Sequence, residues 1–221
     1  MSVQIWQEIF KGLWETLYMS VVSTAFAHIL GLPLGVLLAV TDKQGLKPNV
    51  VVNKALGVVI NILRSIPFLI LFVLVIPLTR IIVGTSIGAS ATIVPLTLAA
   101  APFVARLTET SVKEVDGGAI EAALACGAST FKTVWKAIIP EALPSIIANA
   151  AIAFVTVLGY SAMAGFCGGG GLGAIAINYG YYRNNQKIMF VTVIIIVVIV
   201  QVFQEFGLWL AKLRDRRKKI K

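Results

Sequence analysis

Charged residues are scarce in this sequence. Only 13% of its 221 residues are Asp, Glu, Lys or Arg, whereas 58% are hydrophobic. A soluble domain of ordinary composition carries about 25% charged residues and at most about 50% apolar ones. The chain has too few charges to cover a surface that faces water, which excludes an ordinary soluble globular protein. Because hydrocarbon solvates long apolar runs, the composition predicts an integral membrane protein.

Groups that carry out chemistry are also sparse. The chain has two cysteines and one histidine, and the sequence offers no nucleophilic triad, paired-carboxylate site or metal-binding set. It contains no G-x-x-x-x-G-K-[ST] phosphate loop. None of its ten acidic residues lies near the middle of an apolar run, where gradient-driven transporters usually keep ion-coupling groups. We therefore expect no catalytic residue, metal or cofactor here, and any energy for uphill transport must come from a partner.

Long apolar runs are what the sequence does contain. Five stand out, at residues 17–40, 56–78, 87–104, 145–166 and 188–210. Each is long enough to cross the hydrocarbon layer as a helix, which takes roughly 20 residues. A helix satisfies its own backbone polar groups in lipid, and the alternating pattern of a membrane barrel is absent. The predicted fold is all-α, a polytopic bundle of five transmembrane helices in a single domain over residues 1–221.

Positive charge is unevenly distributed between the connections. If the five spans alternate in direction, fifteen Lys and Arg residues lie on one side of the membrane and four on the other. Cytoplasmic connections carry the excess of Lys and Arg, so we predict an outside N-terminus and a cytoplasmic C-terminus. The ending KLRDRRKKIK directly follows the last run, where such clusters bind anionic lipid headgroups. We expect lipid contact at this ending and no nucleic-acid partner.

The longest cytoplasmic connection, residues 105–144, has the pattern of short helices separated by breaks. The Asp-Gly-Gly stretch that starts at Asp116 can end one helix and cap the next. Residues 119–126 are rich in Ala, the strongest helix former. Gly127 then suits a helix C-terminus, because glycine enters the left-handed backbone region without strain.

A second short helix is predicted after that glycine. Ser129 is a good N-cap for a helix over residues 130–138, since its hydroxyl oxygen can accept from a free backbone N–H. Pro140 and Pro144 are expected to end this helix before the fourth span. Two short helices joined at a glycine corner form a compact protrusion suited to a groove on another protein.

The same connection resembles the EAA loop of ABC importer permeases. The residues that stand at the family spacing are Glu121, Ala122, Ala123, Gly127 and Pro140. Ala137 and Ile139 stand where the family has Ile and Leu. In that family the loop forms cytoplasmic coupling helices that dock in a cleft of an ATPase subunit, which binds the ATP and Mg²⁺. The resemblance implies ATPase contacts for Glu121, Ala122, Ala123, Gly127, Ser129, Thr130, Phe131, Trp135 and Pro140.

Two further stretches narrow the resemblance. The segment R-S-I-P-F-L, which starts at Arg64, is similar to one in amino-acid importer permeases. The segment S-A-M-A-G from Ser161, the glycine run after it and N-Y-G-Y from Asn178 are similar to methionine-importer permeases. This resemblance implies methionine uptake, of both D- and L-forms, across a bacterial inner membrane. The implied partners are a second copy of the chain, two ATPase subunits and an extracytoplasmic methionine-binding lipoprotein.

Two alternatives stay open. The first is a permease for another amino acid or small solute. The second, from a different class, is a channel or scaffold subunit that needs no ATPase. Candidate residues of a translocation pathway are Asn149, Ser161 and Met163, although helix packing explains these positions equally well. An ATPase subunit that co-purifies with the chain would distinguish an importer from a channel.

The stretch FCGGGGLGA, residues 166–174, contains Gly168-x-Gly170-x-x-Gly173, the glycine spacing of a dinucleotide-binding loop. An apolar helix rather than a strand precedes it, and no acidic residue follows at about 20 positions. The predicted topology also puts this run outside the membrane, away from cytosolic nucleotides. We expect flexible backbone or close packing there, with a docked binding protein in contact with Gly168, Gly170 and Gly173.

Overall fold

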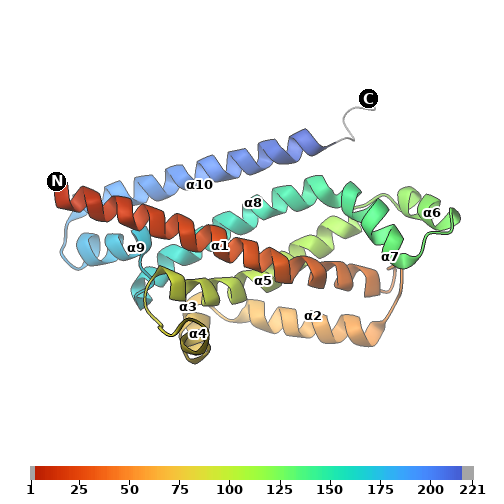
Figure 1. Ribbon diagram of the computed structural model, residues 1–221, viewed down its shortest axis with the longest axis horizontal. Helices are drawn as coiled ribbons and strands as arrows, with labels where there is room; N and C mark the ends of the chain where they lie inside the picture. Colours follow the sequence, from red (N-terminus) through yellow and green to blue (C-terminus); the bar gives the residue numbers. More distant parts are fainter. Residues whose placement is uncertain (1–2, 216–221) are drawn as a thin grey trace.

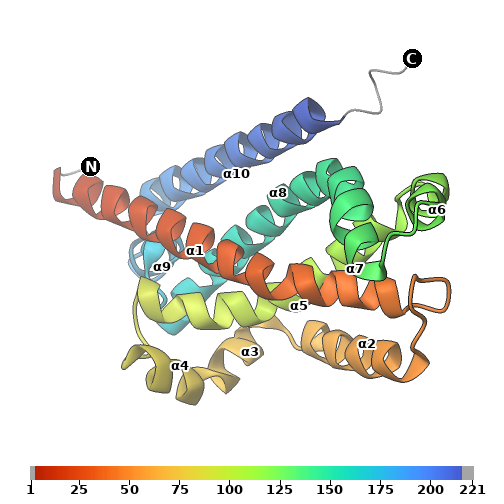
Figure 2. The same cartoon turned by 45° about the vertical axis from the view of Figure 1, so that its right-hand side comes forward.

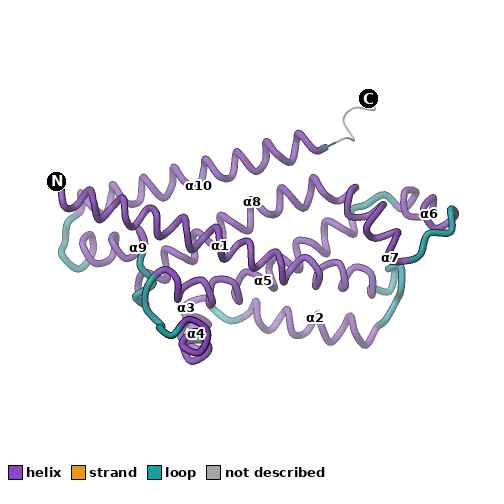
Figure 3. The backbone as a smooth tube through the Cα atoms, in the orientation of Figure 1, coloured by secondary structure: helices purple, strands orange, loops and turns teal. Residues whose placement is uncertain are grey.

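The computed structural model describes residues 3–215, and every regular element in that range is helical (Figures 1 and 3). The predicted all-α fold is confirmed. Four helices are long and apolar enough to cross a membrane, and a bent pair raises the number to as many as five within the described residues. The elements are α1 (Val3–Thr41), α2 (Val50–Ser65), α3 (Phe68–Leu74), α4 (Ile76–Val83), α5 (Ala89–Lys113), α6 (Gly117–Ala125), α7 (Thr130–Thr133), η1 (Val134–Ile138), α8 (Ile139–Ala164), η2 (Gly165–Cys167), α9 (Gly171–Ile175), η3 (Ala176–Tyr181) and α10 (Gln186–Arg214).

The long helices lie roughly along one common axis, with alternating chain direction. The segments that connect them gather at the two opposite ends of this axis. Figure 1 places the N-terminus and α9 at one end, and α6, α7 and the last turns of α10 at the other. This arrangement agrees with the predicted topology, so these are called the outer and the cytoplasmic end. Most of the basic ending falls outside the described residues, where lipid contact stays a prediction; these residues are Arg216, Arg217, Lys218, Lys219 and Lys221.

Helices α1 and α5 form the most extensive helix contact, and small residues make it. A Cβ atom at Gly31 would lie 2.7 Å from the carbonyl oxygen of Ala101, and one at Gly35 would meet the carbonyl of Ala105. Lipid provides no hydrophobic drive between helices, so association depends on this kind of close backbone approach. Helix α1 also begins well before the predicted run at residues 17–40.

The second apolar run is not one straight helix, as the prediction for residues 56–78 had it. Helix α2 ends at Ser65, α3 begins at Phe68, and the two are bent by 101°. Pro67 has no N–H to donate and disfavours helical backbone in the residue before it. Accordingly, Ile66 has a ψ angle of 122°. Figure 2 shows α3 and α4 turning away from the direction of α2.

Helix α5 continues to Lys113 rather than ending at residue 104. The first part of the predicted connection over residues 105–144 is therefore helix. Arg106 and Lys113 each pair with Glu109 at helical spacings of three and four residues, which favours helix in this stretch. Only the residues after Lys113 form the connection to the fourth span.

Pro140 and Pro144 do not end the helix that Ser129 begins, contrary to the prediction. The chain stays helical from Thr130 to Cys167, because a π-helical turn, η1, precedes the first proline. In this wider turn the N–H of Ile139 donates to the carbonyl of a residue five positions back. Pro140 is then the second residue of α8, a position where a missing N–H is tolerated.

Helix α10 packs along α8 at the side of the bundle. The rings of Phe154 and Phe203 stack with centroids 4.3 Å apart, and Gly207 brings the backbone of α10 against Ala151. In the most apolar stretch of α10, only 11% of the residues are buried inside the subunit. The exposed remainder carries large apolar side chains such as Phe190 and Val198. Such a surface is stable in lipid and costly in water.

Candidate functional site

Two side chains define where α6 and α7 begin. At α6, Oδ1 of Asp116 accepts a hydrogen bond from the N–H of Gly118 at 2.8 Å. At α7, Oγ of Ser129 accepts one from the N–H of Lys132 at 3.4 Å. Each bond satisfies a donor that the first turn of a helix leaves free. Both predicted N-caps are confirmed.

Gly127 ends α6 through its backbone conformation. Its φ angle is +74°, in the left-handed region that side chains disfavour. Its N–H donates to the carbonyl of Leu124 at 2.9 Å, and the N–H of Ala128 donates to that of Ala123 at 3.1 Å. This pair of bonds is the Schellman motif. Nothing lies within 4 Å of the place that a Cβ would occupy, so the requirement for glycine is conformational and not steric.

The α6–α7 segment, residues 117–138, lies at the cytoplasmic end (Figure 2), and some of its large apolar side chains are exposed. Phe131 is 72% exposed and Trp135 57% exposed, and their ring centroids lie 6.1 Å apart. Helix α6 contains no buried residue. Among the sequence-predicted ATPase contacts, Ala123 and Thr130 are half-buried, and the exposed ones are Glu121, Ala122, Gly127, Ser129, Phe131, Trp135 and Pro140. An exposed aromatic pair next to a helix that has no buried residue is a surface suited to the docking of another protein.

The opposite side of this segment is fixed to the bundle. Val134 and Ile138 are buried in a cluster with Ala39 of α1 and with Val112 and Val115 at the end of α5. Full burial of an aliphatic side chain contributes about 1.5–3 kcal/mol. The α6–α7 segment is therefore held against the ends of two membrane helices.

At the outer end, the glycine run opens α9 against α1. Oε2 of Glu15 accepts from the N–H of Gly171 at 2.8 Å, and Oγ1 of Thr16 accepts from the N–H of Leu172 at 2.8 Å. A carboxylate at a helix N-terminus is stabilised by the helix dipole. In a dinucleotide loop a phosphate takes this place, whereas here the chain's own carboxylate fills it. Sequence reasoning missed Glu15 and Thr16, which lie 156 positions from their partners.

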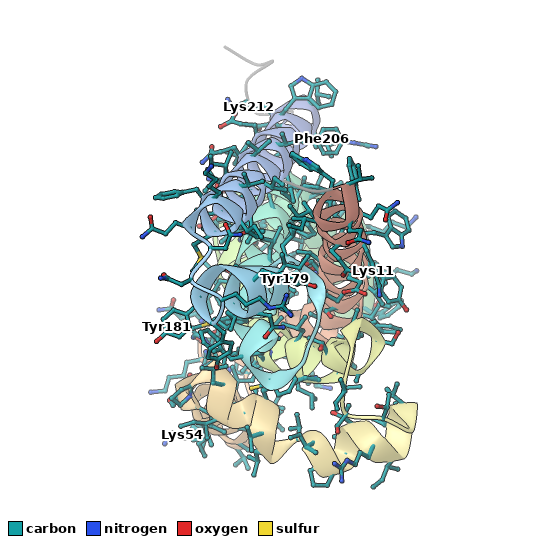
Figure 4. All side chains as sticks on the ribbon, turned by 90° about the vertical axis from the view of Figure 1, so that its left-hand side faces the viewer. Lys11, Lys54, Tyr179, Tyr181, Phe206 and Lys212 are labelled. Carbon is teal, nitrogen blue, oxygen red and sulfur yellow. The ribbon has the colours of Figure 1, made fainter. Side chains whose placement is uncertain are left out.

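The three predicted outer-contact glycines differ in exposure. Gly168 is exposed and Gly170 half-buried, both with φ of +78°. Gly173 is buried, and a Cβ there would meet the carbonyl of Ala162, so this glycine serves helix packing. Beside Gly170 is a cavity of about 240 Å³ that Lys11 and Tyr179 also line; Figure 4 labels both side chains. Contact of Gly168 and Gly170 with a docked protein stays a prediction.

The candidate pathway residues lie in three different environments. Ser161 is fully buried, and its hydroxyl accepts from that of Ser20 at 3.5 Å. The amide of Asn149 donates to the hydroxyl of Ser111 at 2.8 Å, which ties α8 to α5. Met163 is 45% exposed. The first two pack helix against helix, whereas Met163 has an open face; a pathway role for the three stays a prediction.

Comparison with known proteins agrees with this geometry. Residues 31–220 match the model of the family described as binding-protein-dependent transport system inner membrane component. The chain belongs to this family. Curated relatives of this inner membrane component are named probable D-methionine transport system permease proteins. The one from Vibrio cholerae is 50% identical over 209 residues, covering 95% of this chain and 93% of its own. The one from Pasteurella multocida is 44% identical over 217 residues, covering 98% and 100%.

Solved structures match this inner membrane component as well. A chain of the MetNI methionine ABC transporter, solved in an inward-facing conformation, superimposes with a TM-score of 0.96 at 44% identity. The match covers 98% of this chain and 100% of that one. A chain of an amino acid ABC transporter crystallised with histidines reaches a TM-score of 0.72 at 23% identity, over 97% and 96% of the two chains. At that identity the likeness concerns the fold alone.

Proposed function

We propose that this chain is the permease subunit of an ATP-driven importer that carries methionine, in D- and L-forms, from an extracytoplasmic binding protein into the cytoplasm of a bacterium. The observation that carries the proposal is the α6–α7 segment, a fixed helical protrusion with an exposed aromatic pair at the cytoplasmic end. It belongs to a chain that superimposes on one from a methionine ABC transporter. The names of the relatives from Vibrio cholerae and Pasteurella multocida support methionine as the substrate.

Energy enters this chain at the α6–α7 segment. Phe131 and Trp135 offer apolar area to the cleft of a cytoplasmic ATPase subunit, which holds the ATP and Mg²⁺. The small Ala122 on the exposed face of α6 lets this helix approach the cleft closely, and the exposed Glu121 serves as a polar anchor. ATP binding closes the ATPase subunits and displaces the segment. Because the segment is anchored to α1 and α5, the displacement moves those helices as rigid bodies.

The assembly contains two copies of this chain, two ATPase subunits and a lipid-anchored methionine-binding protein on the outer side, in the bacterial cytoplasmic membrane. Large apolar side chains cover the outward faces of α2, α4 and α10, including Val58, Ile81 and Val197. These faces supply surface for lipid and for the second copy. The permease supplies no catalytic group, and its own work is conversion of ATPase closure into alternating access.

Reconstitution tests the proposal. The chain is co-expressed with the ATPase subunit, purified, placed in liposomes and supplied with the methionine-loaded binding protein. We expect the ATPase subunit to co-purify and labelled methionine to enter only with ATP. Uptake that needs no ATPase would indicate a channel. Stronger ATP-dependent uptake of another amino acid, in competition with methionine, would refute the proposed substrate.

A further inference from the structure

A network of ion pairs lies at the cytoplasmic end of α5. Nη1 of Arg106 lies 2.7 Å from Oε2 of Glu109, and Oε1 of Glu109 lies 2.8 Å from Nζ of Lys113. Nζ of Lys113 also lies 2.7 Å from Oδ2 of Asp42, in the connection between α1 and α2. The side chain of Glu109 is only 10% exposed. Two cations therefore neutralise a carboxylate that is largely withdrawn from water, as a buried charge requires.

Arg106 extends this network to α2. Its Nη2 donates to the carbonyl of Gly57 at 3.2 Å and to Oδ1 of Asn61 at 3.0 Å. Ile60 is the one buried residue of α2, packed with Ala105 of α5. Apolar contacts therefore contribute little to the attachment of α2 to the other helices of this subunit. Hydrogen bonds from a charged donor are roughly twice as strong as neutral ones, so Arg106 is a principal attachment of α2 to α5.

The pair that closes the network is ionised under physiological conditions. A hydrogen bond from Lys113 holds the pKa of Asp42 below its ordinary value of 3.8. A lowered carboxyl pKa stabilises the folded contact at pH values above the ordinary one, and this contribution disappears as the pH falls through the lowered value. The link between α5 and the α1–α2 connection is thus fully formed near neutral pH.

The network lies between two parts that move in the proposed transport cycle. Val112 and Val115, on either side of Lys113, belong to the cluster that seats the α6–α7 segment. At the other end, α2 leads directly into the 101° bend before α3. A cavity of about 550 Å³, lined by Asp42 and Leu124, separates α6 from the α1–α2 connection.

We infer that the charges from Arg106 to Asp42 are positioning groups that transmit displacement of the α6–α7 segment to α2 and its bend. The inference rests on the proposed function, because an ATPase must displace the segment. With Ile60 as its one buried residue, α2 has little apolar contact to resist sliding along α5. Hydrogen bonds and ion pairs between fixed donors and acceptors keep α2 and α5 in register while both move.

The experiment measures methionine taken up per ATP hydrolysed, using the full chain with its ATPase subunit and methionine-loaded binding protein. Asp42→Asn removes the charge with little change of shape. It lowers this ratio by at least about fivefold, the low end of common coupling factors, while the ATPase subunit still co-purifies. Asp42→Glu keeps the charge and retains most of the ratio. Lys47→Gln, at an exposed lysine of the same connection, serves as the matched control with the wild-type ratio.

A second variant tests the α2 side of the network independently. Asn61→Ala removes one acceptor of Arg106 and leaves all three ion pairs in place, and it also lowers the uptake per ATP. If Asp42→Asn fails to insert, Asn61→Ala decides alone. Wild-type ratios in the inserted variants overturn the inference, as does loss of ATPase binding in Asp42→Asn, which would make the network part of docking. Absence of ATP-driven methionine uptake by the wild-type complex would instead contradict the proposed function.

Discussion

Replacement of Gly127 tests whether the backbone at the corner of the α6–α7 segment is needed for transport. With φ at +74° and no atom within 4 Å of the added Cβ, a side chain here meets no clash. The penalty is conformational, about 1–2 kcal/mol for an L-residue in the left-handed region, and a β-branched side chain fits this region worst. A penalty of that size lowers the equilibrium constant between the native corner and its alternatives roughly 5- to 30-fold.

We expect Gly127→Val to insert normally and to lower ATP-dependent methionine uptake in liposomes measurably, by at most that same factor, because the strain stays at the corner. Gly127→Asn is the matched variant, since Asn enters the left-handed region more readily than other non-glycine residues. It should keep most of the uptake. Gly117→Ala is the control, with equally open surroundings and without a positive φ.

Full uptake by Gly127→Val would refute this reasoning. A different result is also informative: an equal loss in Gly127→Val and Gly127→Asn would indicate a steric limit set by the docked ATPase. Both variants add a side chain of similar size at the same exposed place, so a steric limit would affect both alike. ATPase activity measured in parallel distinguishes an uncoupled complex from one that has lost its ATPase subunit.

Four other substitutions have defined outcomes. Glu15→Gln removes the charged acceptor at the start of α9, so we expect about 1–2 kcal/mol of lost stability in thermal unfolding of the purified complex; an unchanged midpoint would contradict the cap. Phe131→Ala and Trp135→Ala should each weaken ATPase binding by about fivefold or more at an unchanged unfolding midpoint, and undiminished co-purification would place the contact elsewhere. Pro67→Ala restores an N–H and favours a continuous second span, so uptake should fall with the ATPase still bound; wild-type uptake would show that the proline does not set the bend.

Both ends of α6 and the start of α7 were predictable from sequence because their determinants are local. Asp116, Gly127 and Ser129 each act on backbone groups within a few positions, so the residue type at one place decides the outcome. The ion pairs of Arg106, Glu109 and Lys113 also left a signal, a spacing of three and four residues that the predicted loop obscured. The resemblance to importer permeases covered nearly all of the chain for the same reason: its motifs are short and contiguous.

The two prolines show what local reasoning could not settle. Pro67 and Pro140 both lie in or beside apolar runs. Pro67 coincides with a 101° bend between two helices, whereas the helix continues through Pro140 without a break. The difference depends on whether the preceding turn widens into a π-helix, which tertiary packing decides. The contact of Glu15 with Gly171 is similarly non-local, since nothing near either residue specifies its partner.

The continuous helix from Thr130 to Cys167 has a mechanical consequence. Its 38 residues lead without a break from the surface proposed to contact the ATPase to the glycine run at the outer end, and the helix changes direction at η1, where Figure 2 shows α7 inclined to α8. Helix α8 alone has 26 residues and spans about 39 Å, so a tilt of about 10° about its middle would carry each of its ends roughly 3 Å, in opposite directions. Two events on opposite sides of the membrane, nucleotide-driven closure and release of the binding protein, would then be the two ends of a single movement.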